Sequence, residues 1–323
     1  MPYAFDEFRD LVGSLTNPIS DQDPKVRYIC ALVAELAYLH VPQFEIDHRK
    51  RALIIPCNAY QEIIASGTAS NVLEYLSGLD LERSFVVVDR SIVIVGLVIN
   101  RLLFIGFRGT AFLFDWRINV RSSLAQLKSN IRVSGPMPRI SVSGGGRVHK
   151  GFLEEAVRIS SKIIDEIRNQ NMPEIEHAFI CGHSLGGAVG ALSEPLIMRG
   201  WPASVCIFGS PRYCDITAYA SHSVGPPTQI QRRGDIVPLV PPRSKGYADH
   251  PYQFDTFGKP IIQPIVYSSI PHFIWLSLLF LIKRFEPHSM EAYRRELGRS
   301  ANARFAELSL APFERLMTAK VGA

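Results

Sequence analysis

The sequence predicts an α/β fold with a mixed, mostly parallel central sheet flanked by helices, and two observations indicate it. The first is a set of three consecutive runs rich in valine and isoleucine, separated only by short polar turns: 85–88, 92–99 and 102–107. Such runs are typical of neighbouring antiparallel strands. The second is a later alternation of helical patterns with short apolar runs: 178–181, 205–208 and 228–231. Alternating strands and helices form parallel sheets, so we expect a mixed sheet overall.

The helices are predicted from apolar residues that recur at helical spacing. The segments with this pattern are 24–40, 152–167 and 185–198. The first of them begins with Pro24, a residue favoured in the first turn of a helix. Residues 134–146 hold two prolines and four glycines, so we expect irregular structure there.

The composition is that of a folded globular protein. Hydrophobic residues make up 47% of the 323 residues and charged residues 20%, which excludes an intrinsically disordered chain. This length can fold around one large core, so we predict a single domain over residues 1–323. The five cysteines are odd in number and lie partly in apolar runs, so no disulfide framework is predicted.

The formal net charge is +5, but the basic residues are scattered along the chain. No helix-turn-helix, zinc-finger or RNA-binding motif accompanies them, so we expect no nucleic-acid partner. A mildly positive surface also suits contact with anionic lipid.

The N-terminal residues 1–10 are acidic and lack the basic start and apolar stretch of a secretory signal. We therefore expect a cytoplasmic protein, with peripheral contact to a membrane as a further option. The most apolar stretch, residues 270–282, contains a proline and polar residues. It is also shorter than the roughly 20 residues that cross a bilayer, so it does not predict a transmembrane helix.

The segment Gly182-His183-Ser184-Leu185-Gly186 lies between a predicted strand and a predicted helix. At a very tight strand-to-helix turn a serine is held in a strained conformation, and side chains two residues before and after it would collide. Gly182 and Gly186 avoid that collision. The pattern predicts that Ser184 is a nucleophile; a glycine-rich phosphate loop or an ordinary turn is the alternative.

A nucleophilic serine needs a histidine that removes its proton and a carboxylate that orients the histidine. We expect the carboxylate to be Asp235, which follows a predicted strand and precedes a loop fixed by Pro238. We expect the histidine to be His288, at an apparent helix start. The competing candidates are Asp215, Asp255, His250 and His272.

The oxyanion that forms during the attack needs preorganised hydrogen-bond donors. The amide of Leu185 follows the nucleophile at the start of a helix and is one natural donor. We expect the second donor in the loop after an early strand, Phe107-Arg108-Gly109-Thr110. There Gly109 permits a close approach, and Thr110 offers both an amide and a hydroxyl.

Five segments, in this order, resemble the successive motifs of the fungal-type (class 3) lipases, within the α/β-hydrolase superfamily. The segments are Phe107-Arg108-Gly109-Thr110, Val148-His149-Lys150-Gly151-Phe152, Gly182-His183-Ser184-Leu185-Gly186-Gly187-Ala188, Phe208-Gly209-Ser210-Pro211-Arg212 and Arg233-Gly234-Asp235-Ile236-Val237-Pro238. The resemblance covers roughly residues 70–297, which leaves a helical N-terminal extension at 1–70 and a C-terminal tail at 298–323.

The resemblance implies an α/β-hydrolase fold and a catalytic triad of Ser184, Asp235 and His288. It also implies an oxyanion hole formed by Thr110 and Leu185. The segment around His288, His-Ser-Met-Glu-Ala-Tyr, matches the family over fewer residues than the other motifs do. The chemistry requires neither a metal nor a cofactor.

Two further histidines lie close to the predicted site in the sequence or within its motifs. We expect His183 and His149 to be hydrogen-bonded structural residues. His183 precedes the nucleophile at a strand end, so its side chain should point away from the side that displays Ser184. No Asp, Glu, Cys and His cluster has the spacing of metal ligands, so no metal site is predicted.

Two apolar segments have alternative interpretations. In class 3 lipases the residues after the oxyanion loop form a movable lid, so the resemblance implies a lid or substrate-binding role for Phe112, Leu113, Phe114 and Trp116. Ordinary core residues are the alternative. Residues 270–282 form either a buried element that positions His288 or an apolar wall that contacts acyl chains or a membrane.

The predicted function is a lipase or carboxylic ester hydrolase that cleaves acyl esters of lipids, acylglycerols first among them, with interfacial activation. A phospholipase A1 and a broad carboxylesterase are alternatives that share every residue discussed above. A non-catalytic lipid-binding scaffold on a hydrolase fold is the alternative of another class. The expected partner is a lipid or ester substrate, and no obligate protein partner is implied.

Overall fold

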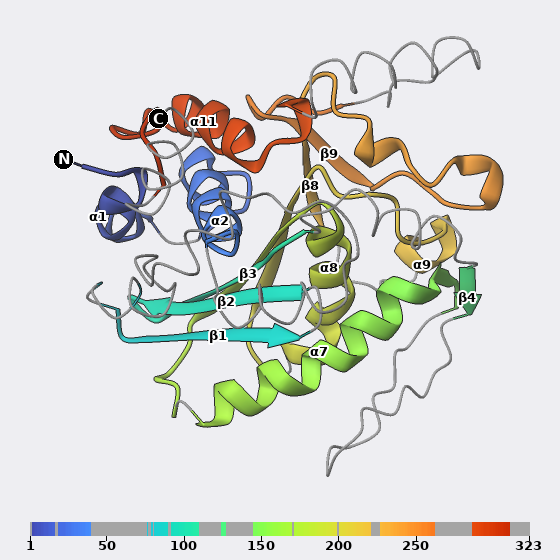
Figure 1. Ribbon diagram of the computed structural model, residues 1–323, viewed down its shortest axis with the longest axis horizontal. Coiled ribbons are helices and arrows are strands. Elements are labelled where there is room, and N and C mark those ends of the chain that lie inside the picture. Colours follow the sequence, from blue (N-terminus) through green and yellow to red (C-terminus); the bar gives the residue numbers. More distant parts are fainter. Residues whose placement is uncertain are drawn as a thin grey trace, which may run out of the picture.

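The computed structural model describes most of the chain around one central sheet (Figure 1). The residues that it describes are 2–16, 19–39, 76, 79, 81–89, 92–109, 124–126, 145–169, 171–198, 200–220, 227–261 and 286–310.

A seven-stranded sheet forms the centre of the molecule. Its strands, in order across the sheet, are β1 (Arg83–Asp89), β2 (Ile92–Ile99), β3 (Leu102–Phe107), β6 (His177–His183), β7 (Ala203–Phe208), β8 (Thr228–Gln231) and β9 (Tyr252–Asp255). The first three strands pair antiparallel, and β3, β6, β7, β8 and β9 pair parallel. The predicted mixed and mostly parallel sheet is confirmed. The last strand, β9, was not predicted, because it is short and carries an exposed Tyr252 and polar residues.

Helices cover both faces of this sheet. On one face α2 (Pro24–Leu36) packs against α1 (Phe8–Gly13) and α11 (Met290–Ser300), and α2 also contacts β3 and β6. On the other face α7 (Lys150–Asn169) packs against α8 (Leu185–Ile197), which contacts β6 and β7. Figure 1 shows α2 and α11 side by side, with α7 on the opposite side of the sheet.

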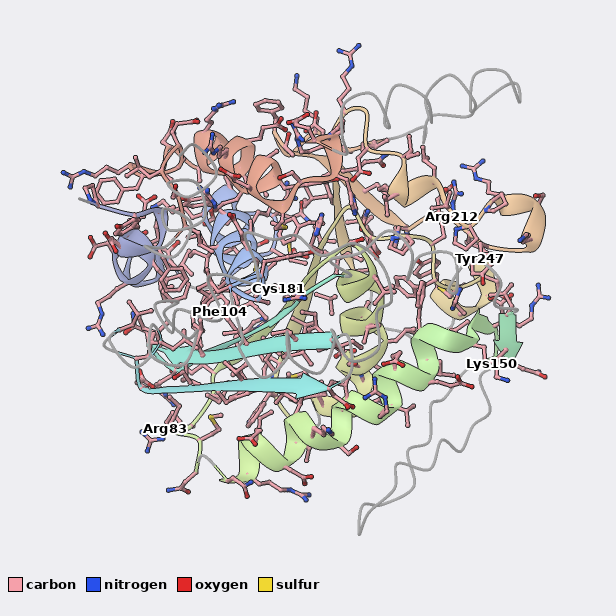
Figure 2. The ribbon with its side chains drawn as sticks, in the orientation of Figure 1. Arg83, Phe104, Lys150, Cys181, Arg212 and Tyr247 are labelled. Carbon is pink, nitrogen blue, oxygen red and sulfur yellow. The ribbon has the colours of Figure 1, made fainter. Side chains whose placement is uncertain are left out.

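The strands alternate their side chains between two separate cores. Phe104, Phe179 and Cys181 belong to the core under α2, whereas Ile105 and Ile180 belong to the core under α8. Figure 2 shows Phe104 and Cys181 in the interior of the molecule and Arg83 and Lys150 at its periphery. Both faces are apolar because each is covered by helices, which explains why these strands read as continuous hydrophobic runs in the sequence.

The smaller described elements lie around this framework. They are the 3-10 helices η1 (Ala4–Glu7), η2 (Val237–Leu239), η3 (Arg243–Lys245) and η4 (Glu286–His288), the helix α9 (Ile216–Ala220), and the two-stranded sheet of β4 (Leu124–Gln126) and β5 (Arg147–His149). Of the segment predicted to be irregular, residues 145 and 146 are described, and they lie outside helices and strands. Four cysteines lie in the described part of the chain, all as buried free thiols, and Cys57 lies outside it.

The helix α2 begins where the sequence predicts and ends earlier than expected. The Asp23 side chain accepts a hydrogen bond from the Lys25 backbone N–H at 2.8 Å, which caps the first turn. The helix ends at Leu36, so the prediction that it continues to His40 is wrong. After Leu36 the backbone forms tighter bonds of the 3-10 type, with the N–H of Tyr38 donating to the carbonyl of Glu35 at 2.8 Å. This turn determines where the Tyr38 side chain lies.

Buried ionic contacts fasten the N-terminal segment to the C-terminal one. Arg294 of α11 has no exposed surface, and its Nε lies 2.5 Å from Oε2 of Glu35 on α2. The same guanidinium donates to the backbone carbonyls of Ala306 and Leu308. Glu7 accepts hydrogen bonds from the Tyr28 hydroxyl and from backbone N–H groups of the segment 304–305.

No helix in the described part of the chain is both long enough and apolar enough to cross a membrane. The division into a core, an N-terminal extension and a C-terminal tail stays a prediction.

We predict that Glu35→Ala lowers the free energy of unfolding by about 3–5 kcal/mol, because it leaves the buried Arg294 guanidinium without its counter-charge. The measurement is a urea unfolding curve. The matched control is Glu307→Ala, which removes the exposed partner of Arg299 and should leave the unfolding midpoint nearly unchanged. Equal midpoint shifts for the two variants would contradict the prediction.

Candidate active site

Ser184 lies at the turn between β6, which ends at His183, and α8, which begins at Leu185. Its backbone has φ 57° and ψ −132°, a combination that a residue with a side chain rarely adopts. Such a conformation costs about 1–3 kcal/mol and persists only where the surrounding structure holds it. Here the Ser184 N–H donates to the Phe208 carbonyl at 2.9 Å, and its carbonyl accepts from Gly187 N–H at 3.0 Å.

The two glycines of the motif are required by close backbone packing around this turn. A Cβ on Gly182 would lie 2.6 Å from the Gly186 carbonyl oxygen, and one on Gly186 would lie 2.5 Å from the carbonyl oxygens of Phe107 and Arg108. Backbone atoms cannot move aside as a flexible side chain can. The turn is therefore restricted to glycine at both positions, as the sequence pattern predicts.

Asp235 and His288 lie together although 53 positions separate them in the sequence. His288 Nδ1 lies 2.9 Å from Oδ2 of Asp235, whose side chain has no exposed surface. Oδ1 of Asp235 accepts a hydrogen bond from the Val237 N–H at 2.9 Å. A buried carboxylate in this position holds the proton of the imidazole on Nδ1, which leaves Nε2 as the basic nitrogen.

Tyr293 makes a further hydrogen bond to the same carboxylate, which the sequence analysis did not identify. Its hydroxyl donates to Oδ2 of Asp235 at 2.6 Å and accepts from the Arg232 N–H at 3.0 Å. Burial, and then the charge of Asp235, hold the pKa of Tyr293 well above its usual range, so the hydroxyl keeps its proton. The signal was present: Met290, Tyr293 and Leu297 have helical spacing, which places Tyr293 on the buried side of α11.

Gly209 follows β7 and provides the space for this arrangement. Its φ is +54°, and a Cβ there would lie 2.6 Å from Oδ2 of Asp235 and 3.1 Å from Nδ1 of His288. The quoted motif Phe208-Gly209-Ser210-Pro211-Arg212 thus contains a residue that packs directly against the Asp235–His288 pair.

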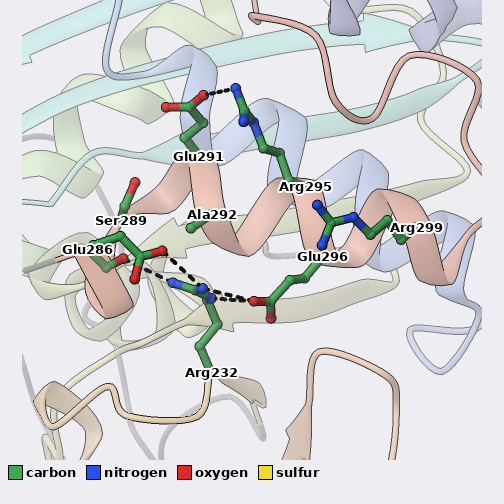
Figure 3. Close-up of a pocket in the computed structure, with 8 residues that line it drawn as sticks. All are labelled: Arg232, Glu286, Ser289, Glu291, Ala292, Arg295, Glu296 and Arg299. Carbon is green, nitrogen blue, oxygen red and sulfur yellow. Dashed lines mark hydrogen bonds and ion pairs between the residues drawn. The ribbon is translucent and has the colours of Figure 1, made fainter. Parts of the chain in front are cut away.

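Arg232 fastens the loop of Asp235 to the segment that carries His288. Its guanidinium donates to the Glu286 carbonyl oxygen at 2.9 Å and to Glu296 Oε1 at 2.9 Å, and it also reaches the Glu286 carboxylate. Figure 3 shows Arg232 between these two glutamates, in a pocket on the outer side of α11.

The amide expected to stabilise the oxyanion belongs to Leu185, the first residue of α8. The first N–H groups of a helix have no partner within the helix, and they lie at its positive end. Gly109 lies against the nucleophile, because a Cβ on it would be 2.8 Å from Cβ of Ser184. Thr110, the second expected donor, lies outside the described residues, as do Phe112, Leu113, Phe114, Trp116 and residues 270–282.

The competing candidates that the structure describes have other roles. Asp215 pairs with Arg147 and accepts from the Ala218 N–H, and Asp255 accepts from two backbone N–H groups in a turn. His250 is buried, and its Nδ1 lies 2.9 Å from the Tyr219 hydroxyl. His272 lies outside the described residues.

The two histidines expected to be structural are both buried and hydrogen-bonded. His149 stacks on the Phe152 ring and accepts from the Phe152 N–H at 3.3 Å. The Tyr38 hydroxyl lies 2.6 Å from Nδ1 of His183. The His183 ring also lies beside His288, with 4.5 Å between the ring centroids, a contact that the sequence did not indicate.

Among the described residues no three His, Cys, Asp or Glu side chains lie close enough together to hold a metal ion. A serine on a strained turn, an oriented histidine and a buried carboxylate are the groups that nucleophilic catalysis uses.

Residues 104–245 match the model of the family described as lipase (class 3). The resemblance to the class 3 lipases is confirmed. The matched segment includes all five sequence motifs and ends before His288. Among these motifs are the strand-to-helix turn with Ser184, called the elbow below, and the loop with Asp235. The matched segment is less than half of the chain. Helix α2 precedes it and helix α11 follows it, so both lie outside the class 3 lipase match.

A known lipase is similar to the chain over part of its length. Lipase A of Sodiomyces alcalophilus is 34% identical over an alignment of 126 residues, and the match covers 33% of this chain and 30% of that protein. The chain thus matches less than a third of that relative's length.

Three solved structures of fungal lipases show more distant similarity. The Rhizomucor miehei triacylglyceride lipase is 21% identical, with a TM-score of 0.43 over 72% of this chain and 78% of that one. The LIP2 lipase of Yarrowia lipolytica is 19% identical, with a TM-score of 0.45 over 72% and 78%. The lipase of Rhizopus microsporus var. chinensis is 23% identical, with a TM-score of 0.41 over 66% and 74%. At these values the chemistry has to be inferred from this chain's own residues.

The buried His250 should make the stability of the folded protein depend on pH in the acid range. Burial lowers the pKa of His250 to about 4, whereas an unfolded histidine titrates near 6.5. Between about pH 6.5 and pH 4 the unfolded state therefore binds a proton that the folded state does not. The contribution of His250 is complete above about pH 6.5, and on the order of 3 kcal/mol is lost as the pH falls to about 4.

The measurement is the free energy of unfolding of the wild type and of His250→Gln at several pH values from 4 to 7.5. The variant should lose less stability than the wild type over this interval, whatever its stability at pH 7.5. Parallel curves for the two proteins would contradict the prediction.

Proposed function

We propose that this protein is a serine hydrolase that cleaves carboxylic esters of lipids through an acyl-enzyme intermediate. The observation that carries the proposal is that Ser184 lies on a strained strand-to-helix turn, while the buried Asp235 holds His288 by its Nδ1 at 2.9 Å. The strained backbone of Ser184 costs free energy of folding, and strained residues of this kind are concentrated at functional sites.

The reaction follows from the order in which these groups exchange a proton. Nε2 of His288 takes the proton from Ser184 as the Oγ attacks the ester carbonyl carbon, and a tetrahedral intermediate forms. The amide of Leu185 and a donor from the Thr110 loop stabilise its oxyanion. The intermediate collapses when His288 gives the proton to the leaving alcohol, and Ser184 remains acylated. A water molecule, deprotonated by His288, then attacks the acyl carbon and forms a second tetrahedral intermediate. This intermediate collapses as His288 returns the proton to the Oγ of Ser184, and the acid is released.

The imidazolium that exists during each step is stabilised by the carboxylate of Asp235. Hydrogen bonds from Tyr293 and from the Val237 amide keep that carboxylate in place. Charge-assisted hydrogen bonds of this kind are about twice as strong as neutral ones. These hydrogen bonds therefore keep the Asp235 carboxylate correctly oriented while His288 changes its charge.

The substrate class that we propose is the acylglycerols. The matching class 3 lipase model and the similarity to Lipase A support a lipid ester as the substrate. The segment 112–116, with Phe112, Phe114 and Trp116, would suit a lid that opens at an interface. A phospholipase A1 and a broad carboxylesterase use the same catalytic groups. A panel of short esters, triacylglycerols and phospholipids, each assayed below and above its aggregation concentration, distinguishes the three.

A non-catalytic lipid-binding scaffold is the alternative of another class. Such a protein would have no need of a carboxyl group buried against a histidine, because an unused buried polar group only costs stability. Ser184, Asp235 and His288 together thus favour an enzyme over a scaffold.

We predict that Ser184→Ala abolishes hydrolysis of a soluble p-nitrophenyl ester, because the variant lacks the nucleophile. Its melting temperature should stay nearly unchanged, because alanine and serine both carry a Cβ and are therefore strained to a similar degree in this backbone conformation. The matched control is Ser193→Ala: Ser193 is also a buried serine on this part of the chain, but its hydroxyl only donates to the Val189 carbonyl. Turnover that survives in Ser184→Ala would refute the proposed function.

A further inference from the structure

A hydroxyl group from the N-terminal segment reaches the candidate active site. Tyr38 lies in the turn after α2, and its Oη lies 2.6 Å from Nδ1 of His183. The same oxygen accepts a hydrogen bond from the backbone N–H of Gly109 at 3.1 Å. One side chain thus joins the strand end before the nucleophile to the loop that precedes Thr110.

The positions of the protons follow from these two contacts. We assign the hydroxyl proton of Tyr38 to the hydrogen bond with Nδ1 of His183, because Gly109 already donates to the Tyr38 oxygen and Nδ1 of a neutral imidazole can accept. Burial, and then the neighbouring His288, hold the pKa of His183 well below its usual range, so its ring is neutral. A neutral ring that accepts at Nδ1 carries its own proton on Nε2.

His183 continues this connection to the catalytic pair. Its ring lies 4.5 Å from that of His288 and 5.9 Å from that of Tyr293, measured between centroids. A buried neutral ring in this place limits how far His288 can turn. It also adds no positive charge next to a histidine that has to become charged during the reaction.

The contact with Gly109 adds a second constraint, on the oxyanion loop. Gly109 lies so close to the elbow that a Cβ on it would be 2.7 Å from the His183 carbonyl oxygen and 2.7 Å from Oη of Tyr38. Its amide direction is fixed by the Tyr38 hydroxyl, and the next residue is the expected donor Thr110. Stabilisation of an oxyanion depends on donors that are in place before the charge develops.

We propose that Tyr38 is a positioning residue for the reaction, which holds the oxyanion loop and His183 in the arrangement that the transition state requires. The inference rests on the proposed function. Tyr38 does not touch the reacting atoms, so it acts through Gly109 and His183. It also gives the N-terminal segment, which lies outside the class 3 lipase match, a role in catalysis.

The chain offers a matched control for this role. Tyr28 is a buried tyrosine of the same segment, and its hydroxyl donates to Glu7 Oε1 at 3.0 Å rather than to the site. Tyr28→Phe and Tyr38→Phe each remove one hydrogen-bonded hydroxyl, although Tyr38 is only partly buried. A merely structural role predicts the same kinetic outcome for both variants.

The experiment compares kcat, KM and melting temperature for the wild type and both variants, with a soluble short-chain p-nitrophenyl ester below its aggregation concentration. Tyr38→Phe should lower kcat about tenfold and leave KM unchanged, a smaller loss than for removal of a direct oxyanion donor. An alkylboronic acid, which forms a tetrahedral adduct with the serine, should bind weaker by a similar factor. Tyr28→Phe should keep the wild-type kcat.

Two results would overturn the inference: wild-type kcat in Tyr38→Phe, or an equal loss of kcat in both variants. If Tyr38→Phe does not fold, His183→Asn and His183→Leu replace it, since only asparagine keeps an acceptor near the position of Nδ1. The leucine variant should lose kcat more strongly than the asparagine variant, and equal losses would overturn the inference. A wild type without Ser184-dependent hydrolysis would instead refute the proposed function, and this inference with it.

Discussion

The buried carboxylate of Asp235 is the group around which the candidate site is built. It has no exposed surface, so it must be compensated by hydrogen bonds, and it has them from His288, Tyr293 and the Val237 amide. These three donors come from the loop after β8, from the segment before α11 and from α11 itself. The need to satisfy one charge therefore fixes three parts of the chain relative to one another.

The framework that holds this group extends beyond the class 3 lipase segment. Arg294 on α11 is a direct neighbour of Tyr293, and it is fastened to α2 through Glu35. The turn after α2 carries Tyr38, which contacts the elbow from the other side. Tyr293 of α11 thus contacts the Asp235 carboxylate, and Tyr38, in the turn after α2, contacts the oxyanion loop through Gly109. The stability of this helix pair and the geometry of the site depend on the same buried contacts.

The sequence predicted the features that depend on local pattern. Strands β2 and β3 have the predicted bounds, and the strain at Ser184 follows from the glycines at 182 and 186. The contact of Asp235 with His288 was expected from the resemblance and is present, while their catalytic roles stay predictions. Helical spacing places Tyr293 on the buried side of α11, but it does not reveal the contact with Asp235 across 58 positions of sequence. The contact of Tyr38 with His183 spans 145 positions, and no local spacing encodes it. The end of α2 was misjudged because apolar residues continue at helical spacing into the turn.

The most direct test is the rate at which a fluorophosphonate labels Ser184 in the wild type and in Asp235→Asn. Asparagine keeps the shape of the side chain but removes the charge that orients His288 and stabilises its protonated form. We expect an adduct on Ser184 in the wild type and labelling slowed by roughly 10²–10⁴ in the variant. Asp255→Asn, which changes a carboxylate that serves only a surface turn, should label at the wild-type rate. Equal rates in folded wild type and Asp235→Asn, or an adduct on another residue, would refute the role of Asp235 in activating Ser184 through His288.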